Sequence, residues 1–320
     1  MYKAILAGFL LVFMGCKPKA RMPVTDSLFE SGVGQGELTN TTLLEVSGLV
    51  ESINNPGYLW VHNDSGDKAR IFLLDKQGNH KATVWFANTT NRDWEDMAIG
   101  PGPEEGKVYV YVGDIGDNNH NHKKKYIYRI EEPVLDLDVS PDTTVQQVDR
   151  ITFQLPDGPQ DVELLMLDPD TRDLYLVSKR KKKASLYRLP YPQSTTEPIQ
   201  AEVAISEKDF LQYEGESISK QGDELLINDY NALYYYQIVG GDISRDGKEV
   251  LIKSYSSVYY WRKKGNESIT DLLKQDPVRL PYQPEPQGEA IGFDCCGTGY
   301  FTVSEKRGKA TPQLYFYKRK

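Results

Sequence analysis

Polar or acidic residues recur along the chain at the start of short runs of small and aliphatic residues. The six copies are Ser47-Gly48-Leu49, Glu95-Asp96-Met97, Glu163-Leu164-Leu165, Glu216-Ser217-Ile218, Asp242-Ile243-Ser244 and Glu289-Ala290-Ile291. If the fold brings these carboxylates together, they cannot all stay ionised without compensation, because close like charges raise one another's pKa. A hard cation, a paired Lys or Arg, or shared protons would compensate them. The candidate site residues are Glu95, Glu163, Glu216, Asp242 and Glu289, although each glutamate could instead cap backbone amides or pair with a neighbouring blade.

Two turns rich in Asp, Asn and Gly, His62–Asp67 and Gly113–Asn118, offer further oxygen ligands. Calcium prefers about six to eight oxygens from carboxylates, amides and carbonyls. The candidate calcium ligands are Asp64, Asp67, Asp114, Asp117 and Glu95. The same turns could instead be Asx turns held by local hydrogen bonds. Zinc is not expected, because no useful ligand spacing exists among His62, His80, His120 and His122.

Basic residues cluster in two other segments, Ser178–Lys183 and Ser304–Arg307. A metal cation beside Lys and Arg side chains suits a phosphoryl group, because both neutralise its negative charge. The candidate anion-binding residues are Lys179, Arg180, Lys306 and Arg307, and a solvated loop is the alternative for the basic run after Lys179. The chain contains no G-x-S-x-G motif, so the sequence indicates no catalytic nucleophile.

Each of the six motifs is followed by two strand-like runs rich in Val, Ile, Leu and Tyr. The first runs are Tyr58–His62, Lys107–Val112, Leu174–Ser178, Glu224–Asn228, Glu249–Ser254 and Gly299–Ser304. Six such units without a convincing amphipathic helix predict an all-β, six-bladed β-propeller over residues 38–320. The first strand of each blade lines the channel, so the acidic motifs and the loops should meet at one mouth. A double-sheet sandwich is the alternative, but it predicts no acidic motif in every unit.

The sixth unit ends at the C-terminus after its third strand-like run, Gln313–Tyr317. An unpaired edge there would be a site for aggregation. We therefore expect an N-terminal strand, from residues near 37–45, to pair with the last blade and close the ring.

The N-terminus resembles a bacterial lipoprotein leader. Lys3 precedes the apolar stretch Ala4–Met14, which is too short for a bilayer core of about 30 Å and matches a secretory signal. Phe13-Met14-Gly15-Cys16 resembles a lipobox, so we expect a signal peptide over residues 1–15, lipid on Cys16 and a tether over residues 16–37. The protein would be exported and anchored in the cell envelope, with a preference for the outer membrane because Lys17 follows Cys16. An ordinary signal peptide is the alternative.

The formal net charge of −8 disfavours nucleic acid as a partner, because an acidic surface repels phosphates. Two further cysteines, Cys295 and Cys296, are adjacent in the sequence. In an oxidising envelope they could form a vicinal disulfide, and buried free thiols are the alternative.

The acidic blade motifs and the turns His62–Asp67 and Gly113–Asn118 resemble those of the calcium-dependent β-propeller phytases and of related phytase-like and esterase-like propellers. The resemblance covers the repeat layout over residues 38–320 and implies calcium at the channel mouth and hydrolysis of a phosphoester or another ester. A small anionic substrate or an envelope protein would be the partner. The alternative is a non-catalytic envelope scaffold that binds a glycan, peptide or protein, because loops on a rigid ring are free to vary.

Overall fold

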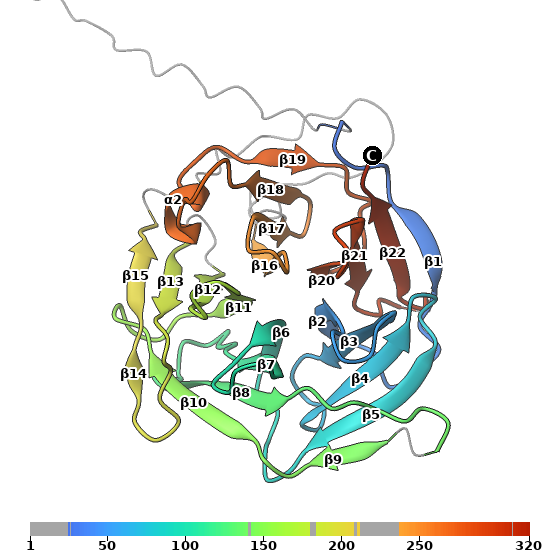
Figure 1. Ribbon diagram of the computed structural model, residues 1–320, viewed down its shortest axis with the longest axis horizontal. Helices are drawn as coiled ribbons and strands as arrows, with labels where there is room; N and C mark the ends of the chain where they lie inside the picture. The colour runs from blue at the N-terminus through green and yellow to red at the C-terminus, as the bar shows by residue number, and fades with distance from the viewer. Residues whose placement is uncertain are drawn as a thin grey trace, which may run out of the picture.

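The computed structural model describes residues 25, 27–139, 142–179, 184–207, 210–211, 237–308 and 310–320. Five sheets of four or five strands surround a central axis, with their strands nearly all antiparallel (Figure 1). This arrangement confirms the all-β propeller that the sequence predicts. The innermost strands are β2 (Val46–Glu51), β6 (Trp94–Pro101), β11 (Val162–Leu167), β16 (Ile238–Ile243) and β20 (Gly288–Phe293).

Each blade continues outward from its inner strand. The first blade adds β3 (Tyr58–Asn63), β4 (Arg70–Asp75), β5 (His80–Phe86) and β9 (Thr143–Val145). The second adds β7 (Val108–Asp114), β8 (Lys125–Glu131), β10 (Asp149–Gln154) and β14 (Ile199–Gln200), and the third adds β12 (Leu174–Ser178), β13 (Leu186–Leu189) and β15 (Glu202–Ile205). The fourth adds β17 (Glu249–Ser254), β18 (Val258–Arg262) and β19 (Val278–Leu280), with helix α2 (Ile269–Leu273) between the last two, and the fifth adds β21 (Gly299–Ser304), β22 (Gln313–Lys318) and β1 (Val33–Glu37).

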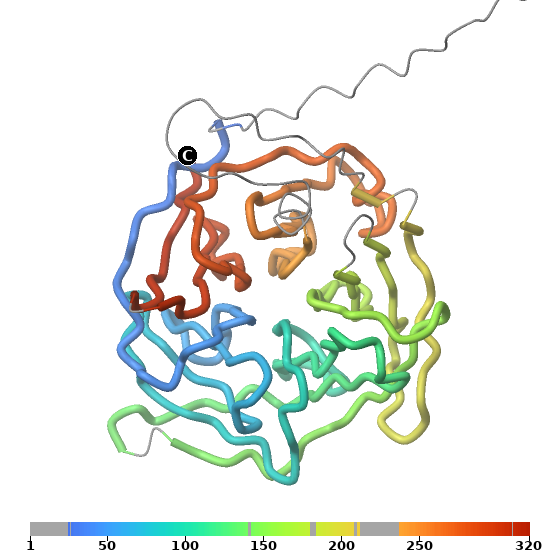
Figure 2. The backbone as a smooth tube through the Cα atoms, turned by 180° about the vertical axis from the view of Figure 1, so that it is seen from behind, coloured from blue at the N-terminus to red at the C-terminus, as the bar shows by residue number. Residues whose placement is uncertain are grey.

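The N-terminal strand closes the ring, as predicted. Strand β1 runs antiparallel to β22, with Val33 opposite Phe316 and Glu37 opposite Gln313. The two strands lie side by side in both views of the chain (Figures 1 and 2). The closing strand lies slightly upstream of the predicted residues 37–45, and pairing both ends of the chain in one sheet covers an edge that would otherwise be open.

The described residues form five blades, so the predicted number of six is too high by one. Strand β16 packs directly between β11 and β20: Gly241 faces the Leu164 side chain of β11, and Gly240 faces the Glu289 carbonyl of β20. The lack of side chains at these glycines allows the close approach. The predicted unit around Glu216 lies outside the described residues, and the next inner strand, β16, begins at Ile238. A motif of three residues was too short to count blades.

All five inner strands carry a β-bulge at the equivalent position. The bulged residues are Ser47, Glu95, Glu163, Val239 and Glu289. A bulge inserts one residue that the neighbouring strand does not pair, and this redirects its side chain. The recurring acidic motif therefore marks the β-bulges, which direct three glutamates toward one mouth of the channel.

The apolar core lies between neighbouring blades. Trp60 and Val50 of the first blade pack with Trp94 and Val110 of the second, and the other blade interfaces hold similar clusters. Inner strands such as β2 and β11 are buried along their whole length because other sheets cover both of their faces. This packing makes the ring a rigid frame for the side chains at its mouth.

Candidate metal centre at the channel mouth

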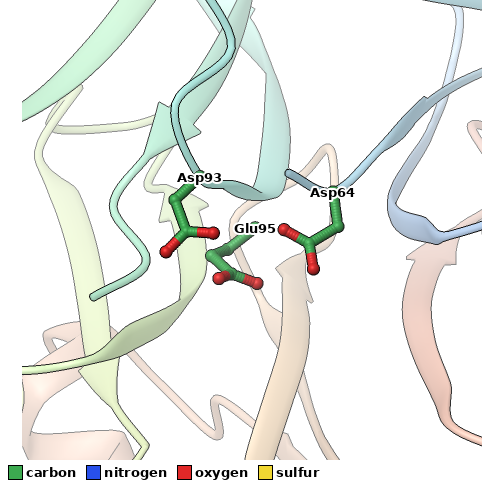
Figure 3. A group of neighbouring side chains, drawn as sticks. All are labelled: Asp64, Asp93 and Glu95. Carbon is green, nitrogen blue, oxygen red and sulfur yellow. The ribbon is translucent and has the colours of Figure 1, made fainter. Parts of the chain in front are cut away.

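Two groups of carboxylates meet where the inner strands begin. Asp64 follows β3, Asp93 precedes β6 and Glu95 is the bulged residue of β6; one oxygen of each lies within 4.8 Å of the others (Figure 3). A second group with the same spacing joins Glu95 to Asp161, which precedes β11, and to Glu163, the bulged residue of β11. Glu95 belongs to both groups, so it is the centre of the cluster.

Burial makes negative charge costly at this mouth. Glu95 and Glu163 are 2% and 1% exposed. The pKa of Glu95 is well above its usual value. Burial is the main cause, and the neighbouring Glu163 carboxyl is the next. Burial also raises the pKa of Asp64 to about 8, and the nearby acidic groups add to this shift. A bound cation would relieve both effects, because it compensates the desolvated carboxylates.

The two carboxylate oxygens of Glu163 differ in their partners. Its Oε1 lies 2.9 Å from the ammonium of Lys179. Its Oε2 is buried and accepts no hydrogen bond from any residue that the structure describes. Buried polar atoms in folded proteins nearly always have a partner, so an unsatisfied oxygen indicates a water or an ion at that point.

A glycine keeps the space around Glu95 open. Gly116 lies in the loop between β7 and β8, and its backbone N–H donates to the Asp93 carbonyl over 3.1 Å. A Cβ atom at this position would overlap Glu95 Oε1 and Asp93 Oδ2. The loop can therefore approach the two carboxylates only because residue 116 has no side chain.

The opposite side of the mouth is a hydrogen-bonded chain rather than an open cluster. Lys179 Nζ donates to the Tyr255 hydroxyl over 3.2 Å, and this hydroxyl donates to Glu289 Oε1 over 2.6 Å. Ser47 Oγ donates to Glu289 Oε2 over 3.3 Å. Both oxygens of Glu289 thus have partners, whereas the groups around Glu95 depend on whatever fills the space between them.

Of the candidate calcium ligands, Asp64 and Glu95 lie in the cluster, and the other three stabilise loops. Asp67 forms an ion pair with Arg70 at 2.7 Å. Asp114 accepts the Asp93 N–H over 3.1 Å and pairs with Arg92. Asp117 accepts the N–H groups of Asn121 and His122, and the Lys125 ammonium lies 3.9 Å from it.

The remaining candidates are spread over several places. Glu163 and Glu289 lie at the mouth, whereas Asp242 lies near the far end of β16 and accepts the Phe293 N–H over 2.8 Å. Glu216, Arg180 and the lipidation site Cys16 lie outside the described residues.

Lys306 is exposed, and Arg307 pairs with Glu305 at 3.2 Å. Cys295 and Cys296 are free thiols with their Sγ atoms 3.5 Å apart.

Sequence reasoning missed Asp93 and Asp161. Each stands two residues before a bulged glutamate, in Asp93-Trp94-Glu95 and Asp161-Val162-Glu163. This repeated Asp-x-Glu pattern was a usable signal, because a bulge next to the strand start can bring both carboxylates to the same mouth. The described acidic oxygens suit a hard divalent cation such as calcium, and no described cysteine or histidine belongs to either group.

No family model and no curated protein matches this chain. Among solved structures, it is similar to a gluconolactonase of Xanthomonas campestris, with a TM-score of 0.46 and 11% identity over 90% of this chain and 89% of that one. It is also similar to a hydrazine synthase of Kuenenia stuttgartiensis (TM-score 0.39, 11% identity, 78% and 66% coverage) and to the WD40 repeats of RRP9 (0.39, 10%, 85% and 79%). Likeness at this level concerns the propeller fold and says nothing about chemistry.

Proposed function

We propose that the protein binds one divalent cation, calcium, between Asp64, Asp93 and Glu95 and hydrolyses an ester at the channel mouth. The observation that carries this proposal is the group of three carboxylates, Asp64, Asp93 and the buried Glu95, whose oxygens lie within 4.8 Å of one another. When bound, the cation would polarise the ester carbonyl and acidify a water molecule. The residues of the chain would hold it through an all-oxygen ligand set.

Glu305 is suited to proton transfer at this mouth. It follows β21, and burial raises the pKa of its carboxyl to about 7, with a further contribution from the neighbouring Glu289. A general base works best when its pKa lies near the working pH. Glu305 lies near the site, because its charge is among those that raise the pKa of Asp64, and we assign to it the removal of a proton from the attacking water.

The charges around the mouth favour an uncharged ester over a phosphoester. The described basic groups nearest the site are already engaged: Lys179 by Glu163, Lys125 by Asp117 and Arg307 by Glu305. An additional anion would have to compete with these carboxylates for the same cations. A carboxylic ester or lactone adds no negative charge and meets no such competition.

Hydrolysis tests this proposal. With calcium present, we expect turnover of p-nitrophenyl acetate that EDTA abolishes and that exceeds turnover of p-nitrophenyl phosphate. Glu305→Gln should lower kcat by about a hundredfold, the lower end of the range for general bases, while calcium binding stays unchanged. Calcium binding without turnover of either ester would reject the hydrolase and favour the binding scaffold.

We also propose that the protein is exported and attached to the cell envelope through lipid on Cys16. The support is the leader sequence alone, since residues 1–24 lie outside the described part of the chain. Within that described part, no helix is long and apolar enough to span a membrane. Cys16→Ser should move the protein from the membrane fraction to the soluble fraction, and unchanged membrane association would contradict lipid attachment.

A further inference from the structure

A cavity lies at the other end of the channel, away from the carboxylate cluster. Its volume is about 410 Å³, and its lining includes the last residue of every inner strand: Glu51, Pro101, Leu167, Ile243 and Phe293. All five blades therefore contribute to it. A cavity of this size fits a small organic molecule.

Much of the cavity wall is apolar. Besides Leu167, Ile243 and Phe293, it includes Ile53 and Ile99, both of which are half-buried. Such a wall binds hydrocarbon and repels a hydrated metal ion. The carboxylates that could hold a metal ion lie elsewhere. Neither of the two carboxylate groups found among the described residues contains a residue of this cavity's lining.

One carboxylate in this wall has no compensating positive charge among the residues that the structure describes. Asp242 lines the cavity, and its Oδ2 accepts the N–H of Phe293 over 2.8 Å. Burial raises the pKa of Asp242 to about 7, and backbone N–H groups alone oppose this shift. None of the described lysine or arginine side chains lies within ion-pair distance of it, so within the described part of the chain the counter-charge is left to a ligand.

The charged groups around Asp242 leave the cavity acidic. Glu51 is paired with Lys76 at 2.8 Å, and Lys107 is held by Glu104 and Glu131, each at 2.9 Å. Among the described residues, the lining contains the carboxylates of Glu51, Asp170, Asp242 and Asp294 and two basic side chains, Lys107 and Arg245. Deeper in the channel, Asp96 is fully buried, and the Asp242 carboxylate is one of the causes that raise the pKa of Asp96 well above its usual value.

We propose that this cavity binds a small organic cation, with its ammonium group on Asp242 and its apolar part against Ile99, Leu167 and Phe293. An ammonium would pair with the uncompensated carboxylate, and the apolar wall would take up the hydrocarbon. The inference does not depend on the cation site at the channel mouth.

Calorimetry with matched probes tests the proposal at about pH 8, where Asp242 is ionised. Benzylamine should bind the full-length protein saturably at one site, whereas benzyl alcohol, of the same size but without charge, should bind at least about tenfold more weakly. Asp242→Asn should weaken the binding of benzylamine by a similar factor, because the Asn side chain keeps an oxygen that can accept the Phe293 N–H but carries no charge. The control Asp170→Asn changes an exposed carboxylate of the same lining and should leave binding unchanged.

Two further variants keep the test decisive. Ile53→Trp should fill the cavity and abolish benzylamine binding without removing Asp242, which covers the case in which Asp242→Asn does not fold. Glu95→Gln, at the opposite mouth, should leave benzylamine binding intact. Equal binding of benzylamine and benzyl alcohol, or benzylamine binding that survives both Asp242→Asn and Ile53→Trp, would overturn the proposal.

Discussion

The Lys179 ammonium lies 2.9 Å from Glu163 Oε1 and supplies a positive charge inside the carboxylate cluster. Burial alone would lower the pKa of Lys179, but the adjoining Glu163 carboxylate more than reverses this effect, and the pKa rises well above its ordinary value. The ammonium therefore stays charged. It occupies the group formed by Glu95, Asp161 and Glu163, whereas the group formed by Asp64, Asp93 and Glu95 has no comparable internal cation among the described residues.

Replacing this lysine should change how many cations bind. In Lys179→Met the second acidic group loses its counter-charge but keeps its oxygens, so we expect calorimetry to detect two calcium ions in place of one. Lys306→Met, which removes an exposed ammonium, is the control and should bind one. A single calcium ion in Lys179→Met would show that the ammonium does not substitute for a second cation, and no calcium in the unchanged protein would instead reject the site itself.

Gly116 predicts a steric effect on the same site. The methyl group of Gly116→Ala would overlap Glu95 Oε1 and Asp93 Oδ2, so calcium affinity should fall by at least about tenfold. Gly265→Ala is a suitable control, because a Cβ atom there meets only the Glu267 side chain at 3.7 Å. Equal calcium affinity in the two variants, measured by calorimetry, would contradict a site between these carboxylates.

Stability without calcium should fall as the pH rises. The pKa of Asp64 rises from its ordinary value of 3.8 to about 8 on folding, so between these values the native state binds more protons than the unfolded state. The resulting stabilisation is complete below about pH 4 and is lost as the pH passes through about 8. We expect the Tm in EDTA to decrease from about pH 5 to pH 8 and the Tm gain from calcium to grow over the same interval.

Asp64→Asn provides the control for this pH dependence. The amide does not ionise, so the decrease of Tm with pH should become shallower and the calcium-dependent gain should shrink. A Tm in EDTA that rises with pH in the unchanged protein, or an identical pH profile in Asp64→Asn, would show that Asp64 is not the buried acid that the geometry indicates.

Glu132 predicts a stability effect far from any metal. Its carboxylate is 2% exposed and accepts hydrogen bonds from the Ser52 hydroxyl, the Asn54 N–H and the Trp60 indole N–H. Glu132→Ala should lower the free energy of unfolding by about 3 kcal/mol, because it leaves buried donors without partners. The neighbouring Glu131→Ala removes a half-exposed carboxylate and should change stability by about 0.5 kcal/mol or less. Urea denaturation of the two variants checks this difference.

The sequence predicted the architecture better than the site. The acidic motifs at Glu95, Glu163 and Glu289 coincide with β-bulges. Each inner strand has the same bulged geometry, and this shared geometry is visible in the sequence as a repeated motif. The fourth bulge, at Val239, carries no polar residue, and the residue that the sequence predicts for this position, Asp242, lies three residues later. Spacing along the chain cannot reveal such a shift when the position itself is apolar.

The acidic turns were harder to interpret for a different reason. Asp67 and Asp64 stand in the same turn, yet Asp67 pairs with Arg70 while Asp64 points into the cluster (Figure 3). Their roles depend on side-chain direction, which residue type does not specify. Lys179 was expected to bind an anionic substrate, but its closest described partner is Glu163 of the neighbouring inner strand, and this contact forms only when the blade has folded.

The central claim is tested most directly by calorimetric titration of calcium into the full-length protein and into Glu95→Gln. Glu95 belongs to both acidic groups, and Gln keeps its shape while removing its charge. We predict one bound calcium ion in the unchanged protein and in the exposed control Glu104→Gln, and an affinity at least about tenfold weaker in Glu95→Gln. Equal calcium affinity in all three proteins, or no calcium binding by the unchanged protein, would contradict a cation site at the channel mouth.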